Sequence, residues 1–472
     1  MRILLHNLGY LLVISSFFRV IPIVTGLYFG EDIGGFIFTF GLSLVLGVVL
    51  IFLNRPRQDA KVLTLTQGLI LGALAFILLP AISMITYLPS MDYNYLNAYF
   101  EAISGFTTTG ITVYDTLEGL PKSLLLWRAE TQWMGGIGII IIFLFLFSGR
   151  RKSQRTVSDL EEASEASMAL YQAQGFGQKL EGGLRYTLAV VMAIYVGYTL
   201  LGIILLLATG LPLYDAVAMS FTALSTGGFS VHDEFYASGW VLTALSIIMI
   251  LGSISFIAHY DLVGKKWKEF LFSFEKNVFL AFILVAGLLA MSVAAHFGIT
   301  LFELISAFTT TGYGLSDYAL LPSLLIFVMM LGMLIGGSSS STAGGIKVFR
   351  VYYLIRGIGW HIKKLSNPPS AVIPLKIHGR ETDEKDLSNI AIFVVAYIFT
   401  LILGIVVFLI FGFSFFDSAF QMISALGTVG LQSIDVSVTH PLLRVILIIA
   451  MLFGRLEIFP ILILIRRAFK KT

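Results

Sequence analysis

A short polar segment that ends in glycine occurs four times between long apolar stretches of the sequence. The four copies are 104–110, 222–228, 306–312 and 424–430. Each copy has Ser or Thr first, Thr fifth and Gly seventh, and an Asp follows five residues after the glycine, at Asp115, Asp233, Asp317 and Asp435. The glycines are separated by 118, 84 and 118 residues, so whole units of the chain repeat, and such a repeat dictates the architecture. The pattern predicts one pore built from four similar quarters.

The residue types in these segments suit the coordination of a dehydrated alkali cation. Selective channels replace the water around such an ion with rings of backbone carbonyl oxygens. Carbonyls converge on one axis only when the backbone adopts unusual dihedral angles, which glycine permits. The candidate filter residues are Thr108, Thr109, Gly110, Thr226, Gly227, Gly228, Thr310, Thr311, Gly312, Thr428, Val429 and Gly430. None of them is titratable, which argues against a divalent-cation site that needs carboxylates.

The composition is that of an integral membrane protein. Of the 472 residues, 57% are hydrophobic and only 12% are charged, whereas a soluble domain has about 25% charged residues. The expected surroundings are therefore membrane lipid. The net charge of +3 is too small to indicate a nucleic-acid partner. The chain has no cysteine, which excludes disulfides, thiolate metal sites and cysteine nucleophiles.

Ten apolar stretches are long enough to cross a bilayer, which takes roughly 20 residues. They are 4–29, 34–53, 62–88, 123–148, 186–210, 240–262, 275–297, 322–354, 387–412 and 441–467. The short segments that end at the repeated glycines are expected to be re-entrant pore helices, which are tolerated only inside protein or beside water. Of the 31 Lys and Arg residues, 26 fall in loops on one side. Both termini are therefore expected in the cytoplasm, with the repeats entering from outside.

We expect an all-α integral membrane fold with four tandem helix–pore-helix–helix units around a pseudo-fourfold pore. Residues 1–53 would form an extra N-terminal transmembrane hairpin, and the pore units would be 54–150, 151–263, 264–355 (with a broken second helix) and 356–472. Asn97, Asp215 and Asp417 stand at equivalent positions and are expected to cap the pore helices, with Thr300 in the third unit. All four units share one orientation, which argues against the inverted repeats of a secondary symporter.

A break in the second helix of the third unit is predicted at 336–345. The segment consists of Gly336, Gly337, Ser338, Ser339, Ser340, Ser341, Thr342, Ala343, Gly344 and Gly345, a composition with poor helix propensity. Because lipid cannot solvate the freed backbone, the segment must face a water-filled cavity. Ten such residues are long for a passive kink, and we interpret them as a mobile constriction beneath the filter. A serine hydrolase would need a nucleophile elbow or a nearby base, and no histidine is placed to serve.

These features resemble the TrkH/KtrB/HKT superfamily of potassium transporters, and the N-terminal hairpin points to its TrkH branch. Three more stretches are similar to family motifs, namely 127–138, 336–347 and 454–457. The second and fourth filter segments differ from the Thr-Thr-Thr-Gly of the other two, an asymmetry that the family tolerates. The resemblance covers essentially the whole chain. It implies a homodimer in the bacterial inner membrane, a cytoplasmic nucleotide-binding ring of the TrkA type as partner, K⁺ as the transported ion and no organic cofactor.

Arg455 lies inside the last predicted span, where a charge costs roughly 2.5–3.5 kcal/mol. One interpretation is a structural ion pair with Glu457 or a bond to a carbonyl behind the filter. The other, which the family implies and which we favour, is a fixed positive charge that faces the pore beneath the filter. Arg128 and Glu130 are expected to form a structural pair, because neither falls in the filter register.

We therefore predict a potassium-selective uptake channel or transporter subunit that is not an enzyme. K⁺ would pass the carbonyl filter and be gated by the segment 336–345. Two alternatives use the same pore: an H⁺- or Na⁺-coupled K⁺ symporter, and a Na⁺-permeable relative. Ion flux that continues without any second substrate would favour the channel.

Overall fold

The structure is a computed structural model of the chain. It describes residues 2–55, 65–138, 184–234, 236, 238–293, 297–316, 318–368, 371, 373–377, 380–381 and 384–469. The end of the predicted span 123–148 and the repeated Asp317 lie outside these residues. Within them the fold is helical, apart from one antiparallel pairing of β1 (Lys376–Ile377) with β2 (Arg380–Glu381).

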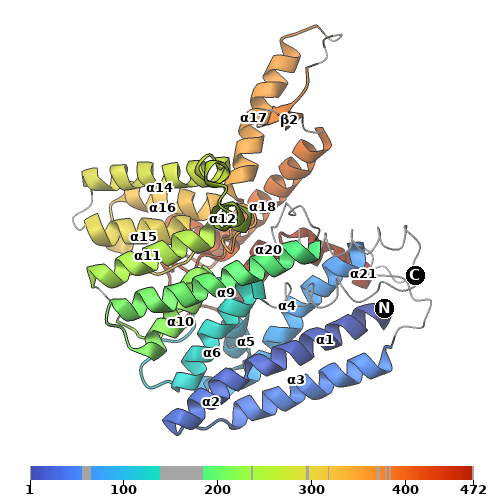
Figure 1. The fold of residues 1–472 in the computed structure, drawn as a ribbon, viewed down its shortest axis with the longest axis vertical. Helices are drawn as coiled ribbons and strands as arrows, with labels where there is room; N and C mark the ends of the chain where they lie inside the picture. The colour runs from blue at the N-terminus through green and yellow to red at the C-terminus, as the bar shows by residue number, and fades with distance from the viewer. Residues whose placement is uncertain are drawn as a thin grey trace.

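The first described residues fold as the predicted extra hairpin. α1 (Arg2–Phe18) and α2 (Val20–Phe29) run in one direction, and α3 (Gly34–Leu53) returns beside α1 (Figure 1). Glycines allow the two backbones to touch. A Cβ atom on Gly9 would lie 2.6 Å from the carbonyl oxygen of Gly47, and one on Gly47 would lie 2.7 Å from that of Gly9. Small residues permit such close contacts between membrane helices, so the hairpin is a tightly packed pair.

Four units follow, each with a first helix, a short pore helix, an extended stretch and a second helix. Unit 1 contains α4 (Leu65–Tyr87), η1 (Leu88–Met91), α5 (Tyr95–Phe106), α6 (Lys122–Trp133) and the π turn η2 (Met134–Gly138). Unit 2 contains α9 (Leu184–Ala208), α10 (Leu213–Leu224), α11 (Gly239–Ser253) and α12 (Phe256–Val263). Unit 3 contains α13 (Trp267–Leu271), α14 (Phe274–Val293), α15 (Phe297–Phe308), η3 (Tyr318–Leu320), α16 (Ser323–Ile335) and α17 (Val348–Leu365). Unit 4 contains α18 (Glu384–Ile410), α19 (Phe415–Leu426), α20 (Pro441–Arg455) and α21 (Phe459–Phe469).

The predicted fold class is confirmed, but two predicted spans are not straight. Among the described residues, six helices are long and apolar enough to cross a membrane, or eight if each bent pair is one span. The stretch 240–262 was predicted as one helix, yet α11 and α12 meet at 102°. The stretch 441–467 was also predicted as one helix, yet α20 and α21 meet at 112°. Hydropathy alone cannot detect such bends, because the residues on both sides of each bend are apolar.

All four second helices lose regular α geometry at the same level. Their N-caps are Pro121, Ser238, Pro322 and His440. Counted from these caps, α6 passes into a π turn after 12 residues, α11 and α20 end after 15, and α16 ends after 13. In three units a glycine at this level packs against the end of the pore helix of the same unit. A Cβ on the glycine would lie within 2.3 Å of the carbonyl oxygen of the last pore-helix residue, in the pairs Gly135 with Phe106, Gly252 with Leu224, and Gly454 with Leu426. The sequence analysis predicted a break only in the third unit.

The pore-helix caps lie three residues before the predicted positions. The N-cap of α5 is Asn94, whose side chain accepts the N–H of Asn97 at 3.1 Å. The N-cap of α19 is Ser414, whose hydroxyl accepts the N–H of Asp417 at 3.1 Å and donates to its carboxylate at 2.7 Å. The other two predicted caps, Asp215 and Thr300, lie inside α10 and α15. The prediction was wrong because a capping box has polar residues at both the N-cap and the third helical position.

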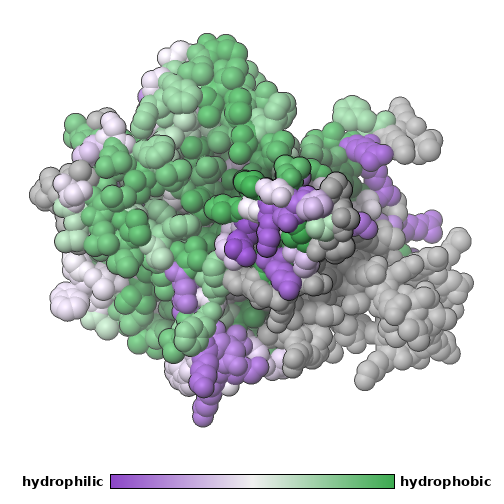
Figure 2. Space-filling view, turned by 90° about the horizontal axis from the view of Figure 1, so that it is seen from above, coloured by the Kyte–Doolittle hydropathy of each residue, from purple (hydrophilic) through white to green (hydrophobic). Residues whose placement is uncertain are grey.

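The outer surface of the helices is apolar. Figure 2 shows hydrophobic residues over most of the described part of one face, with hydrophilic residues gathered in a few clusters. Large apolar side chains are exposed on the outer helices, for example Val45 on α3 (60%) and Leu284 on α14 (63%). An apolar surface of this extent marks contact with a membrane or another protein. Together with the candidate spans, it identifies a multi-pass membrane protein.

Candidate functional site

Each of the four pore helices ends in the same backbone turn. The fifth residue of each repeat has a left-handed φ, which is 53° at Thr108, 53° at Thr226, 55° at Thr310 and 49° at Thr428. The N–H of the sixth residue donates to the carbonyl of the first, and the N–H of the fifth donates to the carbonyl of the second, at 2.8–3.2 Å. This is a Schellman motif, which usually has glycine at the left-handed position. A residue with a side chain costs roughly 1–2 kcal/mol in this conformation. Threonine at the fifth position therefore carries a conformational cost that glycine would not.

The four turns contact one another in a closed ring. The final glycine of each repeat packs on the carbonyl oxygen of the sixth residue in the next repeat. A Cβ atom would lie 2.2 Å from Gly227 O at Gly110, 2.0 Å from Thr311 O at Gly228, 1.9 Å from Val429 O at Gly312 and 2.3 Å from Thr109 O at Gly430. These glycines also have φ between 76° and 108°, a region that glycine enters readily. The contacts run from unit 1 to 2, 3, 4 and back to 1, so the quarters surround one axis.

The threonine hydroxyls of the ring differ in their hydrogen bonding. Thr310 Oγ1 accepts the N–H of Gly344 at 2.7 Å, and Thr226 Oγ1 donates to the carbonyl of Ser225 at 2.7 Å. The hydroxyls of Thr108 and Thr428 are buried and have no hydrogen-bond partner among the described residues. A buried polar group without a partner is expensive. Two such oxygens at one level fit a dehydrated cation, which would accept both as ligands.

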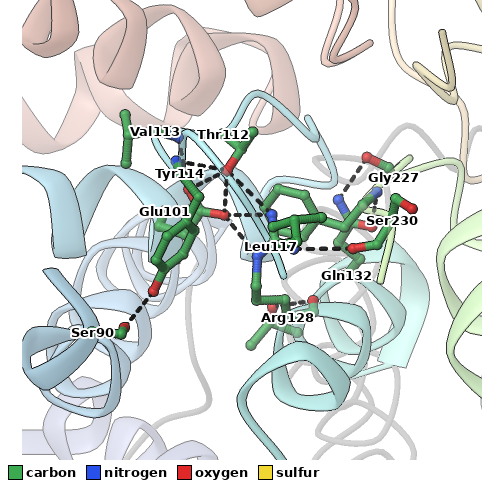
Figure 3. A network of polar contacts seen from close by, with 12 residues as sticks. Ser90, Glu101, Thr112, Val113, Tyr114, Leu117, Arg128, Gln132, Gly227 and Ser230 are labelled. Atoms are coloured by element: carbon green, nitrogen blue, oxygen red, sulfur yellow. Dashed lines mark hydrogen bonds and ion pairs between the residues drawn. The ribbon is translucent and has the colours of Figure 1, made fainter. Parts of the chain in front are cut away.

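Side chains of α6 hold the second turn against the first unit (Figure 3). Gln132 Nε2 donates to the carbonyl of Gly227 at 2.6 Å, and Gln132 Oε1 accepts the N–H of Phe229 at 3.0 Å. One guanidinium nitrogen of Arg128 donates to the carbonyl of Ser230 at 3.1 Å. Both side chains come from unit 1 and bind the backbone of unit 2. They therefore fix the position of neighbouring quarters relative to each other.

Glutamates on two pore helices brace the extended stretches that follow the ring. Glu101 on α5 accepts the N–H of Val113 at 3.1 Å and pairs with Arg128 at 2.8 Å. Glu303 on α15 accepts the N–H of Leu315 at 2.8 Å. The sequence analysis did not assign a role to either glutamate. The signal was present, because each stands nine residues before the final glycine of its repeat.

The segment 336–345, which joins α16 to α17, is largely buried and packs on two turns of the ring. The N–H of Gly344 donates to the Thr310 hydroxyl, and the N–H of Gly345 donates to the carbonyl of Gly427 at 3.1 Å. A Cβ atom on Gly344 would lie 2.2 Å from Thr428 Oγ1. The segment therefore lies directly beside the threonine hydroxyls of units 3 and 4.

The same segment satisfies the backbone groups that the bend in unit 2 sets free. The N–H of Ser338 donates to the carbonyl of Ser253 at 3.0 Å, and the carbonyl of Ser340 accepts the N–H of Phe256 at 2.9 Å. Broken helices at membrane depth are tolerated when neighbouring groups complete their hydrogen bonds. The bend between α11 and α12 and the position of the segment 336–345 therefore depend on each other.

Arg455, the last residue of α20, binds backbone carbonyls of two other units. Its guanidinium donates to the carbonyl of Thr342 at 3.0 Å and to that of Gly135, in the π turn of unit 1, at 2.6 Å. Glu457, which was considered as its partner, pairs with Arg350 on α17 at 2.6 Å. The positive charge therefore lies at the level where all four second helices are interrupted, in contact with the segment 336–345.

The expected pair between Arg128 and Glu130 is not formed. Arg128 pairs with Glu101, which reaches it from the pore helix of the same unit. Residues two apart on a helix do not face each other, so Glu130 points elsewhere. It is 1% exposed, and neither carboxylate oxygen has a hydrogen-bond partner in the described part of the chain.

Comparison with known proteins agrees with this arrangement. The model of the TrkH family, described as "Cation transport protein", matches residues 36–291 and 271–470. The chain belongs to this family. It is 29% identical over 476 residues to an uncharacterized cation transporter of Methanocaldococcus jannaschii, which covers 99% of this chain and 96% of the relative. The predicted membership in the TrkH branch is thereby confirmed.

Other members of the TrkH family match over their full length. The chain is 27% identical to the Trk system potassium uptake protein TrkH of Salmonella typhimurium, over 99% of both proteins. The crystal structure of the potassium transporter TrkH from Vibrio parahaemolyticus superposes with a TM-score of 0.83 at 25% identity. The match covers 100% of this chain and 99% of that one, so the architecture is shared throughout.

Proposed function

We propose that the chain is the ion-conducting subunit of a potassium uptake system. The observation that carries the proposal is the closed ring of four backbone turns, in which each glycine packs on a carbonyl oxygen of the next unit. Backbone carbonyls in such rings replace the hydration shell of K⁺ in selective channels. The names of the relatives from Salmonella typhimurium and Vibrio parahaemolyticus support K⁺ as the transported ion.

In this proposal the ion ligands are oxygens of the ring. They are the backbone oxygens of the twelve filter residues given above and the hydroxyls of two of these residues, Thr108 and Thr428, which have no hydrogen-bond partner in the described part of the chain. The described residues contain no group of three or more His, Cys, Asp or Glu side chains that could hold a metal. Neutral oxygens suit a monovalent cation, whereas a divalent site needs carboxylates. The protein acts as a transporter and not as an enzyme.

The segment 336–345 is the proposed gate, and Arg455 is the proposed positive charge on the permeation path. The segment supports this role because it lies against the threonine hydroxyls of units 3 and 4. Its small side chains cannot block a pore by bulk, so the backbone itself would form the barrier. Arg455 binds this backbone at Thr342. The same guanidinium thus opposes a cation electrostatically and holds the barrier in place.

The proposal includes the assembly and the setting of the protein. We propose a homodimer in the bacterial inner membrane, with both termini and a TrkA-like nucleotide-binding ring in the cytoplasm and no organic cofactor in this chain. The excess of Lys and Arg in loops on one side supports this orientation. The unit boundaries at 53, 150, 263 and 355 belong to the proposal. The boundaries at 53 and 263 coincide with the ends of α3 and α12, the one at 150 lies outside the described residues, and the one at 355 falls inside α17.

Reconstitution into liposomes tests the proposed function. We expect ⁸⁶Rb⁺ uptake down a K⁺ gradient without any Na⁺ or H⁺ gradient, and little uptake of ²²Na⁺. Uptake that requires a Na⁺ or H⁺ gradient would instead identify a symporter that uses the same pore. Equal uptake of Na⁺ and Rb⁺ would identify a Na⁺-permeable relative and would overturn the K⁺ filter.

A further inference from the structure

A single carboxylate outside the pore ring holds the tip of the segment 336–345. Glu275 lies in the first turn of α14, the first helix of unit 3. Its carboxylate accepts the Ser339 hydroxyl at 2.8 and 2.7 Å and the Ser339 N–H at 2.9 Å. Hydrogen bonds to an ionised acceptor are roughly twice as strong as neutral ones. Among the described residues outside the segment, the Glu275 side chain thus makes the most hydrogen bonds to a single residue of the segment.

The same turn of α14 also contacts the helix that follows the segment. The ring of Phe274 packs on that of Tyr352 in α17, with centroids 4.3 Å apart. Lys347, the buried residue just before α17, adds an opposite charge near Glu275. The first turn of α14 therefore touches both the segment 336–345 and the start of α17. A shift of α17 relative to α14 would strain the contact between Glu275 and Ser339.

α17 is suited to transmit such a shift. It extends beyond the body of the molecule beside the start of α18 (Figure 1), and Lys364 near its far end pairs with Glu384 of α18 at 2.9 Å. Close to its start, Arg350 pairs with Glu457 at the bend of unit 4. The start of α17 is therefore held on one side by α14 and on the other by the bend between α20 and α21, while the rest of the helix extends outward.

We propose that Glu275 is a latch, a positioning residue that holds the segment 336–345 in its barrier position through Ser339. This inference rests on the proposed gate. In the latched state the carboxylate fixes the tip of the segment, and the backbone bonds to Ser253 and Phe256 fix the rest. When α17 moves, Ser339 leaves the carboxylate, and the segment loses this anchor on the first helix of its own unit. Opening then becomes a shift between two states of similar free energy.

The choice of Glu275 follows from the kinds of contact that the segment makes. Its bonds to unit 2 join backbone groups or use the Thr342 hydroxyl, which donates to the carbonyls of Leu224 and Gly252, and its bond to Arg455 uses the carbonyl of Thr342. The bonds between backbone groups persist whatever side chains the segment carries. Glu275, by contrast, bonds a serine hydroxyl, so both partners can be removed by single substitutions. The latch is thus separable from the barrier itself by mutation.

The test measures ⁸⁶Rb⁺ flux in liposomes without any regulatory partner, for the full chain. We expect Glu275→Ala to raise basal flux about tenfold, the factor that corresponds to a net loss of about 1.4 kcal/mol from the latched state. Ser339→Ala removes the hydroxyl but keeps the N–H bond, and we expect a smaller increase. The double variant should conduct no more than Glu275→Ala alone, because both changes break one interaction. Glu269→Gln on the neighbouring α13 is the matched control and should leave flux unchanged.

The outcomes separate the latch from the gate. If deletion of 338–344 raises flux but Glu275→Ala and Ser339→Ala do not, the latch is refuted and the gate stands. If the deletion leaves flux unchanged as well, the gate is refuted and the latch with it. A lower melting temperature in both single variants without any gain in flux would show a purely structural contact. Should Glu275→Ala not fold, Glu275→Gln and Ser339→Ala give the same comparison.

Discussion

Replacement of the ring glycines by serine tests the filter most directly. Each substitution adds a Cβ and a hydroxyl at a position where only backbone fits. Real Cβ atoms do not approach a carbonyl oxygen closer than 3.0 Å. The neighbouring carbonyl must therefore move by about 1.1 Å at Gly312, where the built Cβ lies 1.9 Å away, and by about 0.7 Å at Gly430, where it lies 2.3 Å away. Both displacements change the ligand set that the next unit offers to the ion.

The energy of this perturbation is large enough to be seen in ion selectivity. A side chain at positive φ costs roughly 1–2 kcal/mol, and overpacking of a close contact costs roughly 1–3 kcal/mol. The total of about 2–5 kcal/mol exceeds the 1.4 kcal/mol that a tenfold change requires. We therefore expect K⁺ over Na⁺ selectivity to fall at least tenfold. The loss of selectivity should be larger where the added Cβ would lie closer to the neighbouring carbonyl oxygen, so Gly312 and Gly228 should be more sensitive than Gly110 and Gly430.

Gly412 provides the matched control. It has φ of 89°, close to that of Gly110, but a Cβ there would meet nothing within 4 Å. Gly412→Ser therefore carries the conformational cost without the clash, and it should keep selectivity while losing some thermal stability. The assay is competitive uptake of ⁸⁶Rb⁺ and ²²Na⁺ in liposomes. Wild-type selectivity in all four ring variants, or an equal loss in Gly412→Ser, would refute the assignment of the ring as the filter.

Three further outcomes are expected. Arg455→Gln should raise maximal K⁺ flux, because a fixed positive charge opposes a cation in a poorly screened environment; a lower melting temperature without a gain in flux would indicate a structural role. Gln132→Leu should impair selectivity, because Gln132 holds the unit 2 turn. Thr243→Leu, at an exposed position of α11, is the control, and unchanged selectivity in Gln132→Leu would contradict this. Although desolvation alone would raise the pKa of Asp233, hydrogen bonds from the Thr116 hydroxyl and two backbone amides lower it. Its stabilising effect should thus be fully present at pH 7, begin to decline as the pH approaches about 4 and disappear only below the lowered pKa. The melting temperature of Asp233→Asn should therefore lie below that of wild type by an amount that shrinks from about pH 5 to about pH 2, and a difference that stays constant over this range would refute the linkage.

The repeats made the ring predictable from the sequence, because its requirements are local. A glycine at the end of each repeat and a threonine two residues before it are visible without any structure. The break at 336–345 was predictable for the same reason, since its ten residues lack helix propensity. The positions of the long apolar helices followed from hydropathy. These features depend on residue type and short spacing.

The features that were missed depend on contacts between distant segments. The bends after Ser253 and Arg455 occur in apolar stretches, and at Ser253 the segment 336–345 of unit 3 completes hydrogen bonds that the bend sets free. The partner of Arg128 is Glu101, which is 27 residues away and comes close only when α5 packs on α6. Glu275 is 64 residues from Ser339. No local sequence pattern predicts such pairs, although the equal spacing of Glu101 and Glu303 from the ring glycines indicated that these two glutamates have similar roles.

A threonine hydroxyl of the ring accepts a hydrogen bond from the segment 336–345, and this links selectivity to gating. Thr310 Oγ1 accepts the N–H of Gly344, whereas the hydroxyls of Thr108 and Thr428 have no partner among the described residues. While the segment is in place, two of the four threonine hydroxyls of the ring therefore have no partner among the described residues, and those of Thr226 and Thr310 are hydrogen-bonded. When the segment leaves, Thr310 loses its donor, and a buried hydroxyl without a partner is costly. An ion at this level would bind the Thr310 hydroxyl in place of the Gly344 N–H. Removal of the barrier and binding of an ion at the ring therefore favour each other.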